Sequence, residues 1–204
     1  MGVNARRMRR LLRGLLPAAH GAGPLLQRDY WAVIQGCRLT PPEVATLVAS
    51  RFWEFAPEDL VAFRRVDGTT EPLEVGDELE VWIRMSGTVR VRVVHRDRNS
   101  LTLATLIGHP EAGRITFGAY RNDYGDVIFH IRSRARAGSS LRYLGFLTAG
   151  DPMQTNTWTE FVNRVALTAG DGVLGYIHAD TRKIAGAVDG PRAMLSPTFI
   201  AEGE

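Results

Sequence analysis

The chain has 204 residues, of which 45% are hydrophobic and 23% charged, so it can bury a core of its own and is not a disordered protein. No apolar stretch is long enough for a transmembrane helix, and the single cysteine, Cys37, excludes both an internal disulfide and a cysteine-rich zinc site. The net charge of +3 comes from the start of the chain, where five of the 25 basic residues lie within the first thirteen positions.

The rest of the chain is close to neutral. From residue 14 onward, 20 basic residues face 22 acidic ones. A nucleic-acid-binding domain carries a basic stripe in its folded part, and this chain has no such excess there. We therefore expect no nucleic-acid partner.

Residues 1–24 are predicted to be a basic leader that is flexible beside the domain. Residues 1–16 have the pattern of a short helix, which Pro17 ends. Arg13 interrupts the apolar region that a secretory signal needs, so we expect no export and a cytoplasmic location. A helix that contacts a membrane surface or an anionic partner stays open as an alternative for this segment.

The first element predicted after the leader is a strand over residues 27–39, which is rich in aromatic and β-branched side chains. A helix is predicted to begin next, because Thr40 is followed by two prolines and by Glu43, the arrangement of a capping box. This helix should end before Pro57. A polar connection over residues 67–72 then leads to the central part of the chain.

Alternating apolar and polar residues predict five strands between residues 79 and 134. Short turns that contain Gly, Asn or Asp separate them. Such a pattern is typical of an antiparallel meander with one buried face.

After the meander the apolar spacing becomes helical, which predicts a long helix from Thr155 or Asn156 through Tyr176. Gly170, Gly172 and Gly175 are unfavourable in a helix, so a kink or a break is expected there. We expect residues 25–188 to form a single domain and residues 189–204 to form a loose tail.

The order of the predicted elements favours an α+β fold of the helix-grip type, in which a curved antiparallel sheet is covered by a long carboxy-terminal helix. A curved sheet must cover its concave face with another layer. If the helix does not fill the concavity, a pocket remains between helix and sheet.

Residues 105–113 read TLIGHPEAG, and a strand around Phe117 and a second one around Phe129 follow them. This block resembles an uncharacterised bacterial and plant domain family with a T-L-x-G-H-P-E-[SA]-G motif in front of a strand. The family usually has acidic residues after the final glycine, where this chain has Arg114 and Ile115. The resemblance implies a pocket and a fold near the START, birch-allergen and polyketide-cyclase superfamily.

Candidate residues for proton transfer or polarisation are polar or phenolic side chains in and after the motif. Pro110 holds His109 extended, and a histidine beside a carboxylate can exchange protons with a substrate. Local hydrogen bonding within a hairpin is the alternative role for both. The candidates are His109, Glu111, Tyr120 and Tyr143.

Aromatic side chains of the sheet and of the long helix are the candidates for lining a pocket, with plain core packing as the alternative. These are Trp158, Phe161, Tyr176, Phe117 and Phe129. His130 should lie on a solvated face, opposite the core face of its strand.

Three kinds of function remain after the motif search. The chain has no dinucleotide or phosphate-binding glycine motif, no nucleophile elbow and no ligand spacing for a metal, so we expect neither cofactor nor metal. The first hypothesis is a pocket protein that acts on a hydrophobic small molecule as a cofactor-free cyclase or isomerase of natural-product metabolism. The others are a non-catalytic carrier of a lipid or small molecule, and an interaction module with a packed core. A homodimer stays open.

Overall fold

The computed structural model describes residues 5–84, 86–138, 140–185 and 190–198, and within residues 140–153 it describes the backbone alone. No described helix is long and apolar enough to cross a membrane. The helices are α1 (Ala5–Leu12), α2 (Pro41–Ser50) and α3 (Ser140–Ala169), with short 3₁₀ turns at Ala18–His20, Phe52–Phe55 and Ala193–Leu195.

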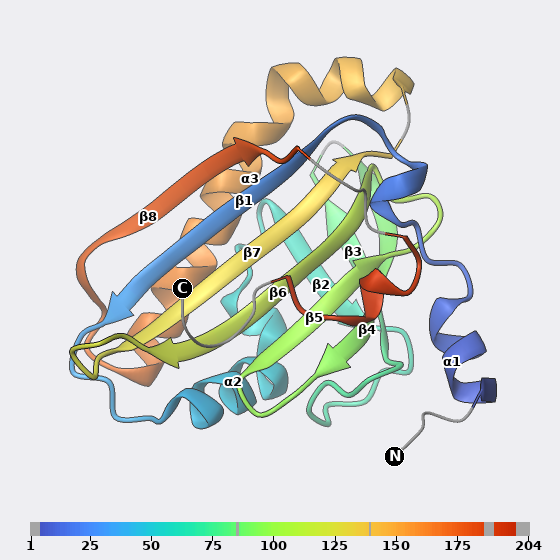
Figure 1. Cartoon of the computed structure of the whole chain (residues 1–204). Coiled ribbons are helices and arrows are strands. Elements are labelled where there is room, and N and C mark those ends of the chain that lie inside the picture. Colours follow the sequence, from blue (N-terminus) through green and yellow to red (C-terminus); the bar gives the residue numbers. More distant parts are fainter. Residues whose placement is uncertain (1–4, 85, 139, 186–189, 199–204) are drawn as a thin grey trace.

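Eight antiparallel strands form one curved sheet in the order β2-β3-β4-β5-β6-β7-β1-β8 (Figure 1). Strands β3 to β7 are the predicted meander, in chain order. Strand β1 lies between β7 and β8, far from its neighbours in sequence. The strands are β1 (Ala22–Ile34), β2 (Val61–Arg65), β3 (Glu78–Ile83), β4 (Gly87–Arg96), β5 (Ser100–Thr105), β6 (Glu111–Arg121), β7 (Val127–Ala137) and β8 (Val173–Lys183).

The sheet and its helices make a helix-grip-like α+β fold. Helix α3 crosses behind the sheet in Figure 1, and α2 lies on the same side. The apolar residues of alternate strand positions point to these helices and form the main core. Phe161 on α3 is fully buried, and the centroids of five neighbouring aromatic rings lie 5.2–6.2 Å from its own; they belong to Phe52, Phe55, Phe117, Phe129 and Trp158.

The start of α2 has the predicted capping box. The side chain of Glu43 accepts hydrogen bonds from the backbone N–H of Thr40 at 2.7 Å and from its hydroxyl at 2.8 Å. These contacts fix the point at which the chain leaves β1 and turns under the sheet. Val44 and Val48, on the inner face of the helix, are buried in the main core.

The prediction of a helix continuing to Tyr176 is wrong beyond Ala169. The chain turns at Gly172, whose φ of +102° suits glycine, and then runs back as β8 beside β1. A Cβ on Gly170 would lie 2.4 Å from the carbonyl oxygen of Gln35, so the glycine lets the helix end pack against the chain after β1. The glycines therefore mark the end of the helix.

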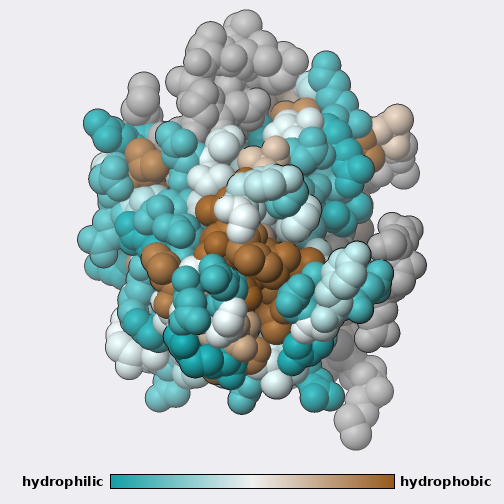
Figure 2. Space-filling model, turned by 90° about the vertical axis from the view of Figure 1, so that its left-hand side faces the viewer, coloured by the Kyte–Doolittle hydropathy of each residue, from teal (hydrophilic) through white to brown (hydrophobic). Residues whose placement is uncertain are grey.

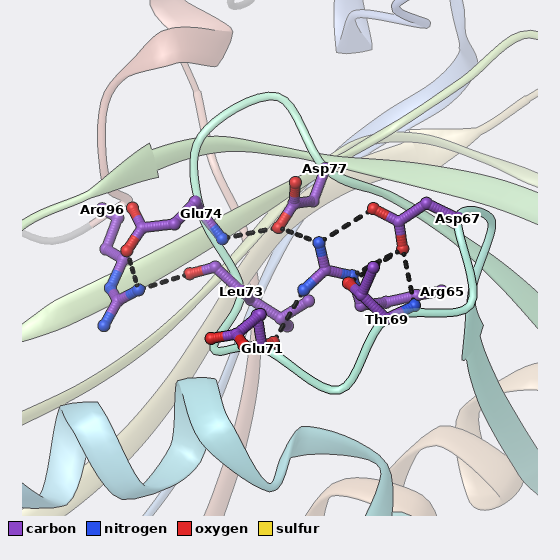
Figure 3. Close-up of polar contacts among 8 residues, drawn as sticks. All are labelled: Arg65, Asp67, Thr69, Glu71, Leu73, Glu74, Asp77 and Arg96. Atoms are coloured by element: carbon purple, nitrogen blue, oxygen red, sulfur yellow. Dashed lines mark hydrogen bonds and ion pairs between the residues drawn. The ribbon is translucent and has the colours of Figure 1, made fainter.

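Strand β2, which the sequence pattern did not predict, is held by the loop between β2 and β3 (Figure 3). The guanidinium of Arg65 donates to both carboxylate oxygens of Asp67 at 3.0 Å and to the carbonyl of Glu71 at 2.7 Å, and it lies 3.1 Å from Asp77. At the other end of the loop, Arg96 donates to the carbonyl of Leu73 at 2.6 Å. This network places β2 and β3 at one end of the concave face.

The convex face of the sheet carries a second, smaller core. Both the predicted leader and the predicted tail contribute to it: Leu15 and Met194 are buried with Val94, Ala104 and Leu106. Arg92 donates to the carbonyl oxygens of Arg10, Leu11 and Arg13 at 2.6–3.2 Å, because the last turn of α1 leaves these carbonyls without helical partners. The domain limits stay a prediction, and described residues of both the predicted leader and the predicted tail contact the sheet.

Candidate functional site

A mostly apolar cavity of about 150 Å³ lies between the concave face of the sheet and α3. Its walls come from every strand from β2 to β7 and from the middle of α3. The apolar wall consists of Leu60, Val61, Phe63, Val81, Ile83, Val91, Leu103, Ile115, Ala135 and Trp158. The polar groups on the wall come from Ser86, Thr105, His109, Glu111, Arg114, Ser133, Gln154 and Thr157.

The hairpin between β5 and β6 brings His109 and Glu111 to this cavity. Gly108 has a φ of +99°, which glycine adopts without strain, and the N–H of His109 closes the turn on the carbonyl of Leu106 at 3.0 Å. At the end of the motif, a Cβ on Gly113 would lie 2.2 Å from the carbonyl oxygen of Arg134, so this glycine is needed for β6 to approach β7.

His109 has one ring nitrogen fixed by its own hairpin. Nδ1 of His109 lies 3.0 Å from the backbone nitrogen and 3.1 Å from the backbone oxygen of Glu111, and these two contacts hold the ring in either tautomer. The ring can therefore donate a hydrogen bond or, once protonated, a proton.

A buried arginine stands behind Glu111. Arg28 on β1 lies on the core face of the strand with a side chain that is 1% exposed, and its Nη1 is 3.4 Å from Oε1 of Glu111, which is 17% exposed. A buried guanidinium is costly unless it is paired with a carboxylate. The pair therefore fixes the orientation of a carboxylate on the cavity wall.

Arg28 was not among the predicted residues, although its strand carried a signal. Tyr30, Ala32 and Ile34 share its face and are buried, so the period-two pattern of β1 places Arg28 inside. A charged residue at an inward position of a strand is a sign of function or of a buried pair. The walls that β2 contributes were missed because that strand was not predicted.

The predicted residues divide into four groups, of which Tyr120 and Tyr176, away from the cavity, are described below. His109, Glu111 and Trp158 line the cavity, and their roles stay a prediction. Phe117, Phe129 and Phe161 are at most 1% exposed in the aromatic core, so they support the cavity from behind. The side chain of Tyr143 lies outside the described residues.

Tyr120 lies on the wrong face of the sheet for the role predicted. Strand β6 points Phe117 and Ala119 to the core, so Tyr120 faces the convex side, where its hydroxyl is 3.2 Å from Nδ1 of His130. Burial raises the pKa of its phenol. The tyrosine is part of a convex-face network and not of the cavity.

His130 is buried, contrary to the expected solvated face. Its Nε2 lies 2.7 Å from the carboxylate of Asp29, which also accepts hydrogen bonds from Arg132 and, at 2.8 Å, from Gln27. Burial by itself would raise the pKa of Asp29, but the bonds from His130, Arg132 and Gln27 outweigh it and hold that pKa well below its ordinary value. This network joins β1 to β7 and β6.

Tyr176 is also away from the cavity. It lies on β8 rather than on a helix, its side chain is 70% exposed, and its ring packs beside His178, which stacks on Trp31 at 3.6 Å. The helical spacing that placed it beside Phe161 does not continue past Ala169.

The sequence model of one family, described as a domain of unknown function (DUF1990), matches residues 45–164, which is more than half of the chain. The chain belongs to the DUF1990 family. The matched part runs from within α2 to the last turns of α3 and includes all the residues named for the cavity wall. Strand β1, with Arg28, and strand β8 lie outside it. No match is found among curated proteins.

Solved structures resemble this DUF1990 protein in fold. A hypothetical protein of Helicobacter pylori, jhp0584, is 9% identical with a TM-score of 0.51 over 69% of this chain and 86% of the other. The KanY protein is 9% identical with a TM-score of 0.51 over 72% of this chain and 99% of the other. The di-domain ARO/CYC StfQ of the steffimycin biosynthetic pathway is 11% identical, with a TM-score of 0.48 over 72% of this chain and 51% of the other.

Proposed function

We propose that this DUF1990 protein binds a hydrophobic small molecule in the cavity between the sheet and α3, with an oxygen function of the molecule turned toward His109 and Glu111. The observation that carries the proposal is an apolar cavity whose described wall holds a carboxylate oriented by Arg28 and a histidine whose ring is held by its own hairpin. Sites for small molecules are mostly apolar with a few placed polar groups.

The size of the cavity limits the ligand. The cavity has a volume of about 150 Å³ and is partly open to the surface. A dry apolar cavity of about that size holds a molecule such as benzene. The proposed ligand is therefore a compact one- or two-ring molecule, or the ring end of a longer molecule that extends out of the cavity.

The polar groups support chemistry that needs no cofactor. Glu111 can accept a proton from a hydroxyl or from a carbon next to a carbonyl, while His109 with a proton on Nε2 can donate a hydrogen bond to the carbonyl oxygen. Proton abstraction of this kind leads to isomerisation or to ring closure of a polyketide-like substrate. A carrier function would use the same cavity and leave the ligand unchanged.

Native mass spectrometry of the protein purified from cells that produce it naturally tests whether a ligand is bound. We expect a bound species in the wild type and its loss in Ala135→Trp, because a tryptophan at this wall position fills the cavity. Tyr124→Trp, at an exposed turn position, is the matched control and should retain the ligand. A bound species that survives Ala135→Trp in a folded protein would place the ligand elsewhere. Incubation with the released ligand then separates an enzyme from a carrier.

Glu111 should select for a hydrogen-bond donor on the ligand. We expect 2-naphthol to bind about tenfold more tightly than naphthalene, because its hydroxyl gains a charge-assisted hydrogen bond. In Glu111→Leu this preference should disappear while naphthalene binding stays, as fluorescence titration can measure. Glu58→Leu, at an exposed position, is the control. An unchanged preference in Glu111→Leu would contradict the assigned role.

A further inference from the structure

Strand β8 ends the sheet and has a free edge. It pairs with β1 on one side, and within the described part of the chain no strand pairs with its other side. Eleven residues long and largely exposed, it presents a row of backbone donors and acceptors for a further strand. The opposite edge strand, β2, has five residues and is flanked by the ion pairs of Arg64 and Arg65.

The side of the molecule that carries β8 also exposes apolar surface. Figure 2 faces the left-hand side of Figure 1, where β8 and the end of α3 lie, and shows a hydrophobic patch framed by hydrophilic residues. Exposed apolar side chains of these two elements are Leu167 at 58%, Leu174 at 52% and Tyr176 at 70%. Leu174 and Tyr176 belong to the first half of β8, ahead of residues 179–183.

The carboxylate of Asp180 on β8 has a like charge, and no described ion-pair partner, beside it in its own chain. Asp180 lies directly opposite Asp29 on β1, and two carboxylates in this position repel each other. Arg132 and His130 bind Asp29, and Arg182 lies 3.8 Å from it. Among the described residues, none is ion-paired with Asp180, which is exposed.

We propose that a second copy of this chain pairs antiparallel with β8 around a two-fold axis at Thr181, so that the two sheets become one. This register pairs residues 179–183 of one copy with the same residues of the other, places Asp180 of each copy opposite Arg182 of the other and gives two cross-strand ion pairs. An axis at Asp180 or at Arg182 would instead set like charges opposite each other. Arg182 has a side chain that is 59% exposed and is free to turn from Asp29 to the neighbouring strand.

The proposal does not depend on the bound small molecule. It uses main-chain pairing for affinity and the Asp180–Arg182 pairs for register, as in other cases of strand addition. The occupant is a second copy because the β8 sequence supplies both the carboxylate and the guanidinium that the register needs.

Sedimentation velocity of the full chain, from about 1 to about 100 µM, tests the proposal. We expect a concentration-dependent species of twice the 22.5 kDa chain mass. Asp180→Arg alone, or Arg182→Asp alone, should raise the dimer dissociation constant by about tenfold or more, because two attractive pairs become repulsive. The double variant should return toward the wild-type value. Asp59→Arg, at an exposed site outside the sheet, should change nothing.

The variants also separate this effect from misfolding. Asp180→Arg places a cation opposite Asp29 within its own chain, so the folded chain should keep its circular dichroism spectrum and thermal unfolding. A wild-type chain that sediments as a monomer at every concentration overturns the proposal. So does an Asp180→Arg variant that dimerises as tightly as the wild type, or a double variant weaker than both single variants.

Discussion

Replacing Asp29 with asparagine is expected to lower the free energy of unfolding by about 3 kcal/mol at pH 7, since a buried ionic network loses the anion at its centre. The Asp29 side chain is 7% exposed and accepts hydrogen bonds from His130, Arg132 and Gln27. Asparagine has one acceptor oxygen, and its amide group would face other donors. Urea denaturation measures the loss, with the exposed Asp123→Asn as the control.

The same variant has a distinctive pH dependence. The pKa of Asp29 is lowered in the folded protein below its unfolded value of 3.8, so its ionisation stabilises the fold above that pH. The stabilisation is lost as the pH falls below the unfolded value and toward the folded one. The difference in stability between wild type and Asp29→Asn should therefore shrink by about 1 kcal/mol from pH 5 to pH 3. A constant difference would contradict a lowered pKa.

Arg65→Ala is expected to cost about 3 kcal/mol of unfolding free energy, because it removes the centre of the network that holds the loop after β2. The Arg65 side chain is 7% exposed, and its loss leaves Asp77 and the carbonyl of Glu71 without their partner (Figure 3). Chemical denaturation measures the change.

The adjacent residue supplies the control for Arg65. Arg64 is ion-paired with Glu80 but is 80% exposed, so Arg64→Ala should leave stability nearly unchanged. Equal effects of the two substitutions would show that burial of Arg65 does not matter. Since Val61 and Phe63 line the cavity, Arg65→Ala should also weaken 2-naphthol binding at temperatures where the protein remains folded.

The meander could be predicted because apolar and polar residues alternate along its strands and short turns separate them. Helix α2 could be predicted because its capping box is local. Strand β8 could not: Val173 and Tyr176 continue the helical spacing of α3, and only the turn at Gly172 separates the two elements. Spacing alone does not distinguish a kinked helix from a helix followed by a strand.

For the cavity, too, only the residues that a local pattern places could be predicted. His109 and Glu111 could be predicted from one local motif, because the hairpin itself presents them. Tyr120 and His130 could not be placed, since the face of a strand that contacts solvent depends on what covers it. The pairing of Arg28 with Glu111 joins residues 83 positions apart, and no local pattern contains it.

The position of β1 has a consequence for how the molecule forms. The first strand of the chain has both of its partners, β7 and β8, about a hundred or more residues later, as in the pairs of Tyr30 with Ile131 and with Ala179. Loops of this length must close before the pairing yields any stabilisation, which makes such steps slow. Strands β2 to β7 can pair with their neighbours as they leave the ribosome, whereas β1 can pair only after β7 has been synthesised. Arg28 becomes buried when β1 joins the sheet. The pairing of β1 with β7 and the ion pair of Arg28 with Glu111 therefore form in the same step.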